Sequence, residues 1–321
     1  MFIVPENLIA GLMTRALAFD AVEAVFASMS MRVAYNFPVI REAIGHEDAL
    51  YGFKGGFDRA GNVLGVKAGG YWPHNMERRQ EINHQSSICL FDPNTGKLHG
   101  IVGGNLLTAL RTAAASAVSI KYLARQDAKI LGMVGAGHQS VFQLRAALEQ
   151  RDFEKVIGWN RSPEKLERLS KVASDAGLEF EAVAIEDMQK ADAIITITSS
   201  FAPSLMANHV SAGTHIACMG TDTKGKQEVA AAVFGNSSVF ADEITQSVTI
   251  GEAQHAITQG IVEATDITEI GQVINGKHPG RRSDSEITLF DGTGVGLQDL
   301  AVASRVVELA VAQGLATEVA F

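Results

Sequence analysis

The fold of this chain is decided by the stretch ILGMVGAGHQSVFQLRAALEQ, residues 130–150. Its apolar start is interrupted by Gly135-Ala136-Gly137, and apolar residues then recur at helical spacing from Val141. This order predicts a buried strand, a tight turn and a helix. Such a turn serves either as the cradle of a dinucleotide pyrophosphate or only as a close strand-to-helix connection.

The residues that follow favour the pyrophosphate cradle. Ser140 replaces the third glycine of the GxGxxG pattern, and a second apolar strand, 155–159, is expected to end about 25 residues after the turn. The end of this strand contacts the adenosine ribose in dinucleotide-binding domains, and an acid there selects NAD(H). Here the residues are Asn160, Arg161 and Ser162. The lack of an acid favours NADP(H), with Arg161 on its 2′-phosphate. The same arginine could stack on adenine or be a solvated loop charge, so either NAD(H) or NADP(H) is expected.

From residue 129 onward, short apolar segments alternate with helical patterns. Further strands are expected at 193–196, 215–219 and 238–241. Apolar strands that alternate with helices predict a mostly parallel sheet with both faces covered. We therefore expect an α/β protein with a Rossmann-type, doubly wound sheet domain, which binds the dinucleotide, over residues 119–299.

The N-terminal part of the chain has a different texture. Between residues 51 and 101, short apolar or alternating segments are separated by turn signals such as DPNTG, 92–96, and this pattern predicts antiparallel hairpins. A long helical pattern at 297–316 ends the chain. We expect residues 1–118 and 300–321 to form a second, α+β domain for substrate binding and dimerisation.

The composition restricts the location and the partners. The chain has 321 residues, 46% of them hydrophobic, which is ample for two cores. Its net charge of −9 argues against a general affinity for nucleic acid or for an anionic membrane. No apolar segment approaches the ~18 residues of a membrane span, and the N-terminus lacks signal-peptide features. We expect a cytoplasmic protein with two buried, unbridged thiols, Cys89 and Cys218, and no metal site, because the histidines lack ligand spacing.

Five ordered motifs give the chain a resemblance to the ornithine cyclodeaminase/mu-crystallin family. They are GVKAGGYWPHN (65–75), LFDPNTGKLHGIVGGNLLTALRTAAASAVS (90–119), GMVGAGHQS (132–140), ACMGTDTKGKQEV (217–229) and LFDGTGVGLQDLA (289–301). The family includes cyclodeaminases, alanine dehydrogenases, ketimine, pyrroline-carboxylate and iminosuccinate reductases, and a thyroid-hormone-binding crystallin. The resemblance implies a homodimer that is joined through the first domains.

The resemblance also implies roles for individual residues. Lys67 corresponds to a lysine that contacts the substrate carboxylate and helps to activate a water, and Arg111 to a second carboxylate ligand. Asp222 corresponds to the acid/base near the reacting carbon. Arg41 corresponds to a further carboxylate ligand, although this chain reads Pro-Val-Ile-Arg where the family usually has Pro-x-Arg. An acid common before the 106–123 helix is replaced by Gly103.

The same comparison gives the expected cofactor contacts. They are Thr112, Gly135, Ala136, Gly137, His138, Gln139, Ser140, Asn160, Arg161, Ser162, Thr198, Met219, Gly220, Gly292, Thr293 and Gly294.

Three of these assignments also make chemical sense without the resemblance. A guanidinium fork and an ammonium are the best ligands for a carboxylate, which suits Arg111 and Lys67. Their alternatives are an arginine on a solvent face and a lysine on a half-exposed sheet. Asp222 follows a predicted strand at its carboxyl end, where open α/β sheets bind ligands, although a turn or helix-cap aspartate would look the same.

These residues predict a reductase that converts an imino acid to an L-amino acid, or the reverse. A redox-neutral ammonia lyase that recycles its NAD, like the cyclodeaminases, and a crystallin-like protein that binds NADPH and a ligand remain the alternatives. On the substrate, His74, Arg78 and Arg79 add positive charge near Lys67, which favours a dicarboxylic imine, iminosuccinate, as the precursor of L-aspartate. They are equally well explained as surface charges that balance Glu77 and Glu81.

Overall fold

The computed structural model describes residues 1–320 and divides into two compact units. Unit 1 comprises Met1–Arg111 and the chain from Val295 onward, and unit 2 comprises Thr112–Gly294. We had expected the boundaries after residue 118, which lies within helix α4 (Asn105–Leu123), and after residue 299, which lies within α11 (Gly296–Ala312). The long α4 therefore begins in unit 1 and continues in unit 2.

Unit 1 is built on an eight-stranded sheet with the order β18-β1-β7-β6-β5-β4-β2, and β3 also pairs with β4. Strands β4 to β7 form the antiparallel hairpins predicted for residues 51–101, which confirms that prediction. The strands are β1 (Phe2–Val4), β2 (Ala34–Asn36), β3 (Ile40–Ala43), β4 (Leu50–Asp58), β5 (Val63–Tyr71), β6 (His84–Phe91), β7 (Leu98–Gly103) and β18 (Thr317–Glu318). The helices besides α4 and α11 are α1 (Glu6–Leu12), α2 (Arg15–Ser30) and α3 (Asn75–Arg79).

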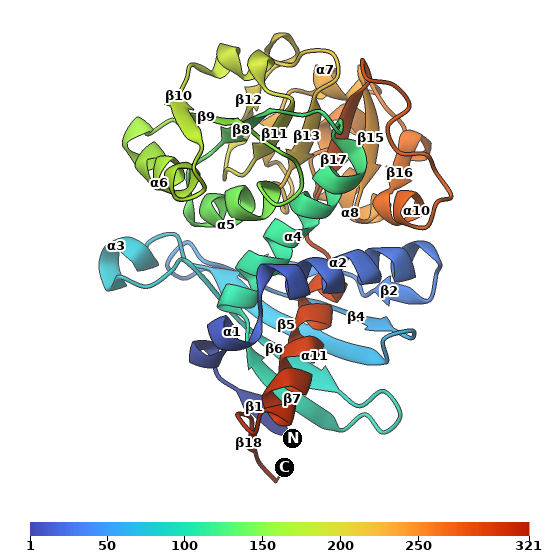
Figure 1. The fold of residues 1–321 in the computed structure, drawn as a ribbon. Helices are drawn as coiled ribbons and strands as arrows, with labels where there is room; N and C mark the ends of the chain where they lie inside the picture. The colour runs from blue at the N-terminus through green and yellow to red at the C-terminus, as the bar shows by residue number, and fades with distance from the viewer. Residues whose placement is uncertain (321) are drawn as a thin grey trace. The chain divides into compact units, whose positions relative to one another are not determined.

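Helix α11 packs closely on β4 and β5 because glycines line the contact (Figure 1). A Cβ atom at Gly56 would lie 2.9 Å from the Leu297 side chain, and one at Gly65 would lie 2.8 Å from that of Leu300. Larger residues would push the helix away from the sheet. The glycines thus bring the polar face of α11 next to the side chains of β5.

Unit 2 contains an eight-stranded sheet in which every pair is parallel, as predicted (Figure 1). Its order is β10-β9-β8-β11-β13-β17-β15-β16. Strands β9 and β10 are added one after the other on one side of β8. The chain then returns and adds β11 on the other side of β8. The order β10-β9-β8-β11-β13 is that of the first five strands of a Rossmann fold, whose ligands bind at the carboxyl ends of the strands on either side of the reversal.

The five strands predicted for unit 2 are observed as β8, β9, β11, β13 and β15, each to within a residue; β10, β12, β14, β16 and β17 were not predicted. The strands are β8 (Ile130–Val134), β9 (Lys155–Trp159), β10 (Glu179–Ala182), β11 (Ala193–Thr196), β13 (His215–Cys218), β15 (Ser237–Ala241), β16 (Ile267–Glu269) and β17 (Ile287–Asp291), with β12 (Phe201–Leu205) and β14 (Gln227–Val229) as a separate pair. The α-helices are α5 (His138–Ala147), α6 (Glu167–Asp175), α7 (Ala231–Phe234), α8 (Ile244–Thr249), α9 (Gln254–Thr258) and α10 (Ile270–Ile274). Short 3₁₀ turns cover Pro163–Leu166, Ile185–Lys190, Ala207–His209 and Ala264–Asp266.

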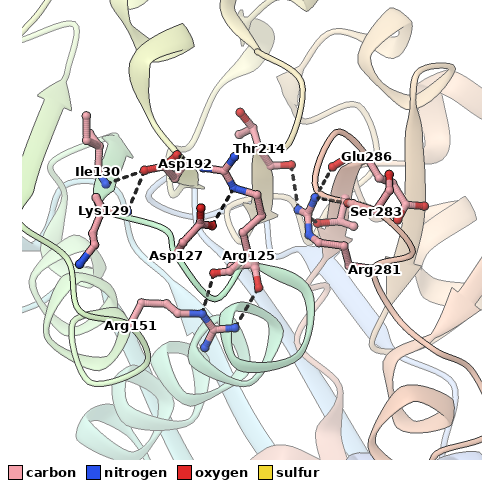
Figure 2. A network of polar contacts seen from close by, with 12 residues as sticks. Arg125, Asp127, Lys129, Ile130, Arg151, Asp192, Thr214, Arg281, Ser283 and Glu286 are labelled. Atoms are coloured by element: carbon pink, nitrogen blue, oxygen red, sulfur yellow. Dashed lines mark hydrogen bonds and ion pairs between the residues drawn. The ribbon is translucent and has the colours of Figure 1, made fainter.

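A network of charged residues closes the amino edge of this sheet (Figure 2). Arg151 donates hydrogen bonds to the carbonyls of Lys121, Ala124 and Arg125, where α4 ends. Asp192 pairs with Arg125 at 2.5 Å and accepts hydrogen bonds from the backbone at the start of β8. The network satisfies the last carbonyls of α4 and anchors the helix to the edge opposite the expected ligand site.

None of the helices within residues 1–320 combines the length and apolar character required to cross a lipid bilayer. Of the two thiols, Cys218 is fully buried in β13, as expected, whereas Cys89 on β6 is only partly buried. The expectation of two buried thiols was therefore wrong for Cys89.

Candidate active site

A buried polar cluster lies between β5, α4 and α11 of unit 1. Lys67 Nζ donates to Asp299 Oδ1 at 3.0 Å and to Thr108 Oγ1 at 2.7 Å. Arg111 Nε donates to the same oxygen of Asp299 at 3.1 Å, and its Nη1 donates to Gln298 Oε1 at 3.0 Å. We call Lys67, Arg111, Asp299 and Thr108 the Lys67–Asp299 cluster. Lys67 and Arg111 are both buried, so neither is the surface residue that the sequence allowed as an alternative.

In this cluster the pKa values of Lys67 and Asp299 are both lowered, for different reasons. Burial lowers the pKa of Lys67 to about 8; Asp299 opposes this shift, and the positive charges of Arg111 and Lys54 add to it. Burial alone would raise the pKa of Asp299, but the charges of Arg111 and Lys67 hold it below its ordinary value. One buried carboxylate is therefore shared by two cations, and a further anion would be bound favourably.

Two further basic residues, His84 and, through it, Arg41, are linked electrostatically to the Lys67–Asp299 cluster. Burial lowers the pKa of His84 to about 3, with smaller contributions from Lys67, Arg111 and Arg41, so the imidazole is neutral. Arg41, on β3, lies directly opposite Gly52 of β4 and is half-buried. The charges of Arg41, Lys67 and Arg111 thus all act on His84.

The glycine turn of unit 2 has the geometry of an anion cradle. Gly135 has φ +108°, and a Cβ there would lie 2.5 Å from the carbonyl oxygen of Ile197, so only glycine fits. Gly137 is the N-cap of α5, makes no side-chain capping bond, and has open space where its Cβ would stand. The first N–H groups of α5 are thus uncapped by a side chain and suited to a pyrophosphate.

The residues after β9 support this turn. Asn160 Oδ1 accepts a hydrogen bond from Ala136 N at 3.1 Å, and its Nδ2 donates to the carbonyl of Ser162 at 2.8 Å. Asn160 therefore orders the turn, a role the sequence did not indicate. Arg161 is exposed.

Two buried glutamates hold the loops at the carboxyl ends of β11 and β13. Glu228 accepts hydrogen bonds from Thr198 N at 2.5 Å, Gly220 N at 2.8 Å and Thr196 Oγ1 at 2.7 Å. Glu252 accepts from the backbone of Glu228 at 2.8 Å and from the hydroxyl of Thr221. Burial, followed by the charge of Glu228, raises the pKa of Glu252 to about 8, so it is protonated at neutral pH. The expected cofactor contacts Thr198 and Gly220 thus share one buried acceptor.

Asp222 lies in the loop that follows β13, at the carboxyl end of the sheet. Its Oδ1 accepts hydrogen bonds from Lys226 Nζ at 2.9 Å and from Thr223 Oγ1 at 3.1 Å. Lys226 Nζ also reaches the carbonyl of Gly220 at 3.3 Å. Asp222 is thus a loop residue rather than a helix cap, and Lys226 ties its side chain to the loop.

The segment after β17 is held by another buried acid. Asp242 accepts hydrogen bonds from Thr293 Oγ1 at 2.7 Å and from Gly294 N at 2.8 Å. Met219 packs against Gly292: a Cβ atom at Gly292 would lie 2.6 Å from the Met219 sulfur. The remaining expected contacts, His138, Gln139, Ser140 and Thr112, lie at the start of α5 and within α4.

Sequence reasoning missed the acids that organise both units. Asp299, Glu228, Glu252 and Asp242 are all buried. Asp299, Glu228 and Asp242 each bind a predicted site residue, and Glu252 holds the backbone of Glu228. The available signal was an acid within an otherwise apolar segment, as in GLQDLAVA, because such a charge needs a partner.

The surface cations near α3 have partners of their own. Arg78 Nη1 pairs with Glu47 Oε2 at 2.6 Å, and His74 lies 3.6 Å from Asp48. Arg78 and Arg79 are exposed and share Glu47. They fit the alternative of balanced surface charges better than a second carboxylate site.

The strand order, the uncapped glycine turn and the acids behind it define unit 2 as a Rossmann-type nucleotide-binding domain. Unit 1 carries a buried cationic site suited to a carboxylate. The family model of the ornithine cyclodeaminase/mu-crystallin family matches residues 10–314. The chain belongs to this family, which confirms the resemblance seen in the sequence.

The chain is similar over its full length to reductases and a dehydrogenase of known name. The iminosuccinate reductase of Paracoccus denitrificans is 62% identical over 320 residues, covering 99% of both chains. Its crystal structure in complex with NAD+ matches with a TM-score of 0.95 and covers 100% of this chain and 99% of the other. An archaeal alanine dehydrogenase dimer with bound NAD is 28% identical, with a TM-score of 0.94 and coverage of 100% and 99%. The Thermococcus litoralis Δ1-pyrroline-2-carboxylate reductase, in complex with NADH and L-proline, is 26% identical with a TM-score of 0.94, covering 99% and 100%.

The substitution Glu228→Ala tests the role of the buried acceptor. It leaves the buried Thr196 hydroxyl and the partly buried N–H groups of Thr198 and Gly220 without their partner, so we expect the free energy of unfolding to fall by about 3 kcal/mol. Urea denaturation followed by circular dichroism measures this loss. The exposed Glu186→Ala is the control and should lie within about 0.5 kcal/mol of the wild type. An equal effect of the two substitutions would contradict the assignment.

Proposed function

We propose that this chain is a nicotinamide-dependent imine reductase that converts iminosuccinate to L-aspartate, with NAD(H) as its cofactor. The observation that carries the proposal is full-length similarity to the Paracoccus denitrificans iminosuccinate reductase, at 62% identity. The Lys67–Asp299 cluster is the structural support, because it offers an ammonium and a guanidinium to a substrate carboxylate. Under this proposal unit 1 binds the substrate and unit 2 binds the dinucleotide.

The α-carboxylate of the substrate is bound by Lys67 and Arg111, with Arg41 as a further ligand. Lys67 uses two of its three N–H groups for Thr108 and Asp299, so one remains for the substrate. Asp299 holds both cations by one oxygen and prevents their repulsion from separating them. Orientation of the carboxylate in this way contributes to catalysis by limiting the imine carbon to one reactive pose.

The proton on the imine nitrogen is managed by Asp222, directly or through a water. Lys226 limits the movement of the Asp222 side chain by the ion pair at 2.9 Å. The glutamates 228 and 252 in turn hold the loop at Gly220 and Thr221.

NAD(H) is favoured over NADP(H) by the three solved relatives, which are named with NAD+, NAD and NADH. The residues that would hold the dinucleotide are the glycine turn, Asn160 and Thr198. When bound, the reduced nicotinamide supplies the hydride that reduces the imine. Arg161 then has no 2′-phosphate to pair with and is a loop cation.

We also propose a cytoplasmic location. Cys89 and Cys218 are free thiols, which a reducing compartment preserves. Expression of a tagged full-length chain followed by cell fractionation tests this.

A rate comparison tests the proposed reaction. Iminosuccinate, formed from oxaloacetate and ammonia, should be reduced with NADH at a higher kcat/KM than the imine of pyruvate or pyrroline-2-carboxylate. The measurement is the loss of the reduced-nicotinamide absorbance, repeated with NADPH. L-Aspartate formation by chromatography confirms the product.

This rate comparison, an assay of ornithine and a measurement of NADPH binding together separate the competing functions. A preference for either monocarboxylic imine would refute the aspartate proposal. Release of ammonia from ornithine without net change of the nicotinamide would identify a cyclodeaminase. Tight NADPH binding without turnover would indicate a crystallin-like binding protein.

The pH dependence of kcat/KM tests the role of Lys67. Its pKa is about 8, and only the protonated ammonium binds a carboxylate, so kcat/KM should fall as the pH rises above about 8. Asp299 raises this pKa, so in Asp299→Asn the fall should begin at lower pH. L-Aspartate oxidation is the suitable direction, because its substrate concentration does not depend on free ammonia. The exposed Asp152→Asn is the control, and identical profiles of all three proteins would contradict the role of Lys67.

We further propose that the chain forms a homodimer through the face of the unit 1 sheet that α11 leaves uncovered. Ile40 and Phe53 lie directly opposite each other on β3 and β4, and are 54% and 43% exposed. Tyr35 on β2 is 50% exposed and contacts the Phe57 ring. Exposed apolar patches of this kind mark protein interfaces.

Sedimentation velocity tests the homodimer. The wild type should sediment as a dimer, and Phe53→Asp should shift it toward the monomer, because a charge in an apolar interface is costly. Phe201→Asp places the same change on an exposed phenylalanine of unit 2 and should leave the dimer intact. A wild-type monomer would refute the proposal.

A further inference from the structure

We propose that Lys54 is the residue that selects a dicarboxylic substrate, by binding the second carboxylate of the imine. This inference rests on the proposed function and goes beyond it, since it assigns the discrimination between dicarboxylic and monocarboxylic imines to one side chain of β4.

The strand register places Lys54 beside the carboxylate ligands. In the antiparallel pair of β4 and β5, Lys54 lies directly opposite Lys67. Directly opposite residues point to the same face of a sheet, with Cβ atoms roughly 5 Å apart. The Lys54 side chain therefore rises from the sheet next to Lys67, on the face where Asp299 lies.

The electrostatics agree with this placement. The charge of Lys54 lowers the pKa of Lys67, after the larger effects of burial, Asp299 and Arg111. It also contributes to the lowered pKa of Asp299. Such an influence on two buried members of the Lys67–Asp299 cluster requires that the Lys54 charge lies near them.

The cations in this region call for more than one substrate charge. Lys54, Lys67, Arg111 and Arg41 act on the cluster or on the adjacent His84, and Asp299 supplies one buried negative charge. His84 is neutral and adds no charge. A dicarboxylate neutralises more of the positive excess than a monocarboxylate, and complementary charge gives specificity.

On this face, no side chain of β4 stands between Lys54 and the position opposite Arg41. The next pair on the same face is Gly52 and Gly69, which carry no side chains. Arg41 on β3 lies directly opposite Gly52 of β4, and β3 borders β4 on the side away from β5 and Lys67. Lys54 and Arg41 thus occupy neighbouring positions on this face of the sheet, beside Lys67. The rival cations, Arg78 and Arg79, are engaged by Glu47 at the surface.

The test compares Lys54→Met with the wild type on the three imines. We expect kcat/KM for iminosuccinate to fall about 10- to 100-fold, mainly through KM, because one charge-assisted contact is lost. The values for the monocarboxylic imines should change less than about threefold. Lys54→Arg should restore part of the iminosuccinate activity, and Lys97→Met, an exposed lysine, is the matched control.

A binding measurement keeps this inference separate from the proposed function. Calorimetry with succinate and with propionate, in the presence of NADH, should show weaker succinate binding in Lys54→Met and unchanged propionate binding. Equal losses for both acids, or for all three imines, would overturn the role of Lys54, as would no loss at all. A wild type that binds succinate in this Lys54-dependent way but reduces no iminosuccinate would refute the proposed function alone.

Discussion

The structure of unit 1 depends on one buried ion cluster, in which the carboxylate of Asp299 holds Lys67 and Arg111. A buried charge is costly unless it is paired, and removal of one partner leaves the others uncompensated. Here the pairing is incomplete, because two cations share one oxygen of a single acid. This imbalance of charge makes the cluster less stable and also favours the binding of a carboxylate. Stability and substrate binding are therefore in competition at Lys67.

The fold serves this cluster by bringing together residues that are far apart in sequence. Lys67 and Asp299 are separated by 232 positions. They meet because glycines on β4 and β5 let α11 approach the sheet closely. In unit 2, Glu228 does comparable work by tying the ends of β11 and β13 to one carboxylate.

Much of this architecture was predictable because it follows from local patterns. The alternation of apolar strands and helices predicted the parallel sheet. The turn was predicted from Gly135, Gly137 and Ser140, whose spacing is that of a turn that binds a pyrophosphate. Lys67 and Arg111 were found through motifs. Asp299 was within a quoted motif, yet nothing local showed that its partner would be a lysine on a distant strand.

The rest required three-dimensional information. The register of β4 against β5, which sets Lys54 beside Lys67, depends on sheet pairing that composition does not specify. Asn160 is expected at the ribose, and nothing in the sequence indicated that its side chain also accepts a hydrogen bond from Ala136 N and so orders the turn. The basic residues near α3 could not be separated from site residues until their pairing with Glu47 was seen.

The acids buried behind the loops of unit 2 make its folding a proton-uptake reaction. Glu252, with a pKa of about 8 in the fold against an ordinary 4.5, carries a proton at neutral pH that the unfolded chain would release. Burial raises the pKa of Asp291 to about 7, so Asp291 adds to this uptake of protons. The stabilisation from these protons is complete below the ordinary pKa values and is lost as the pH rises through about 7 to 8. The heat of unfolding near neutrality therefore includes the ionisation enthalpy of whichever buffer accepts the released protons.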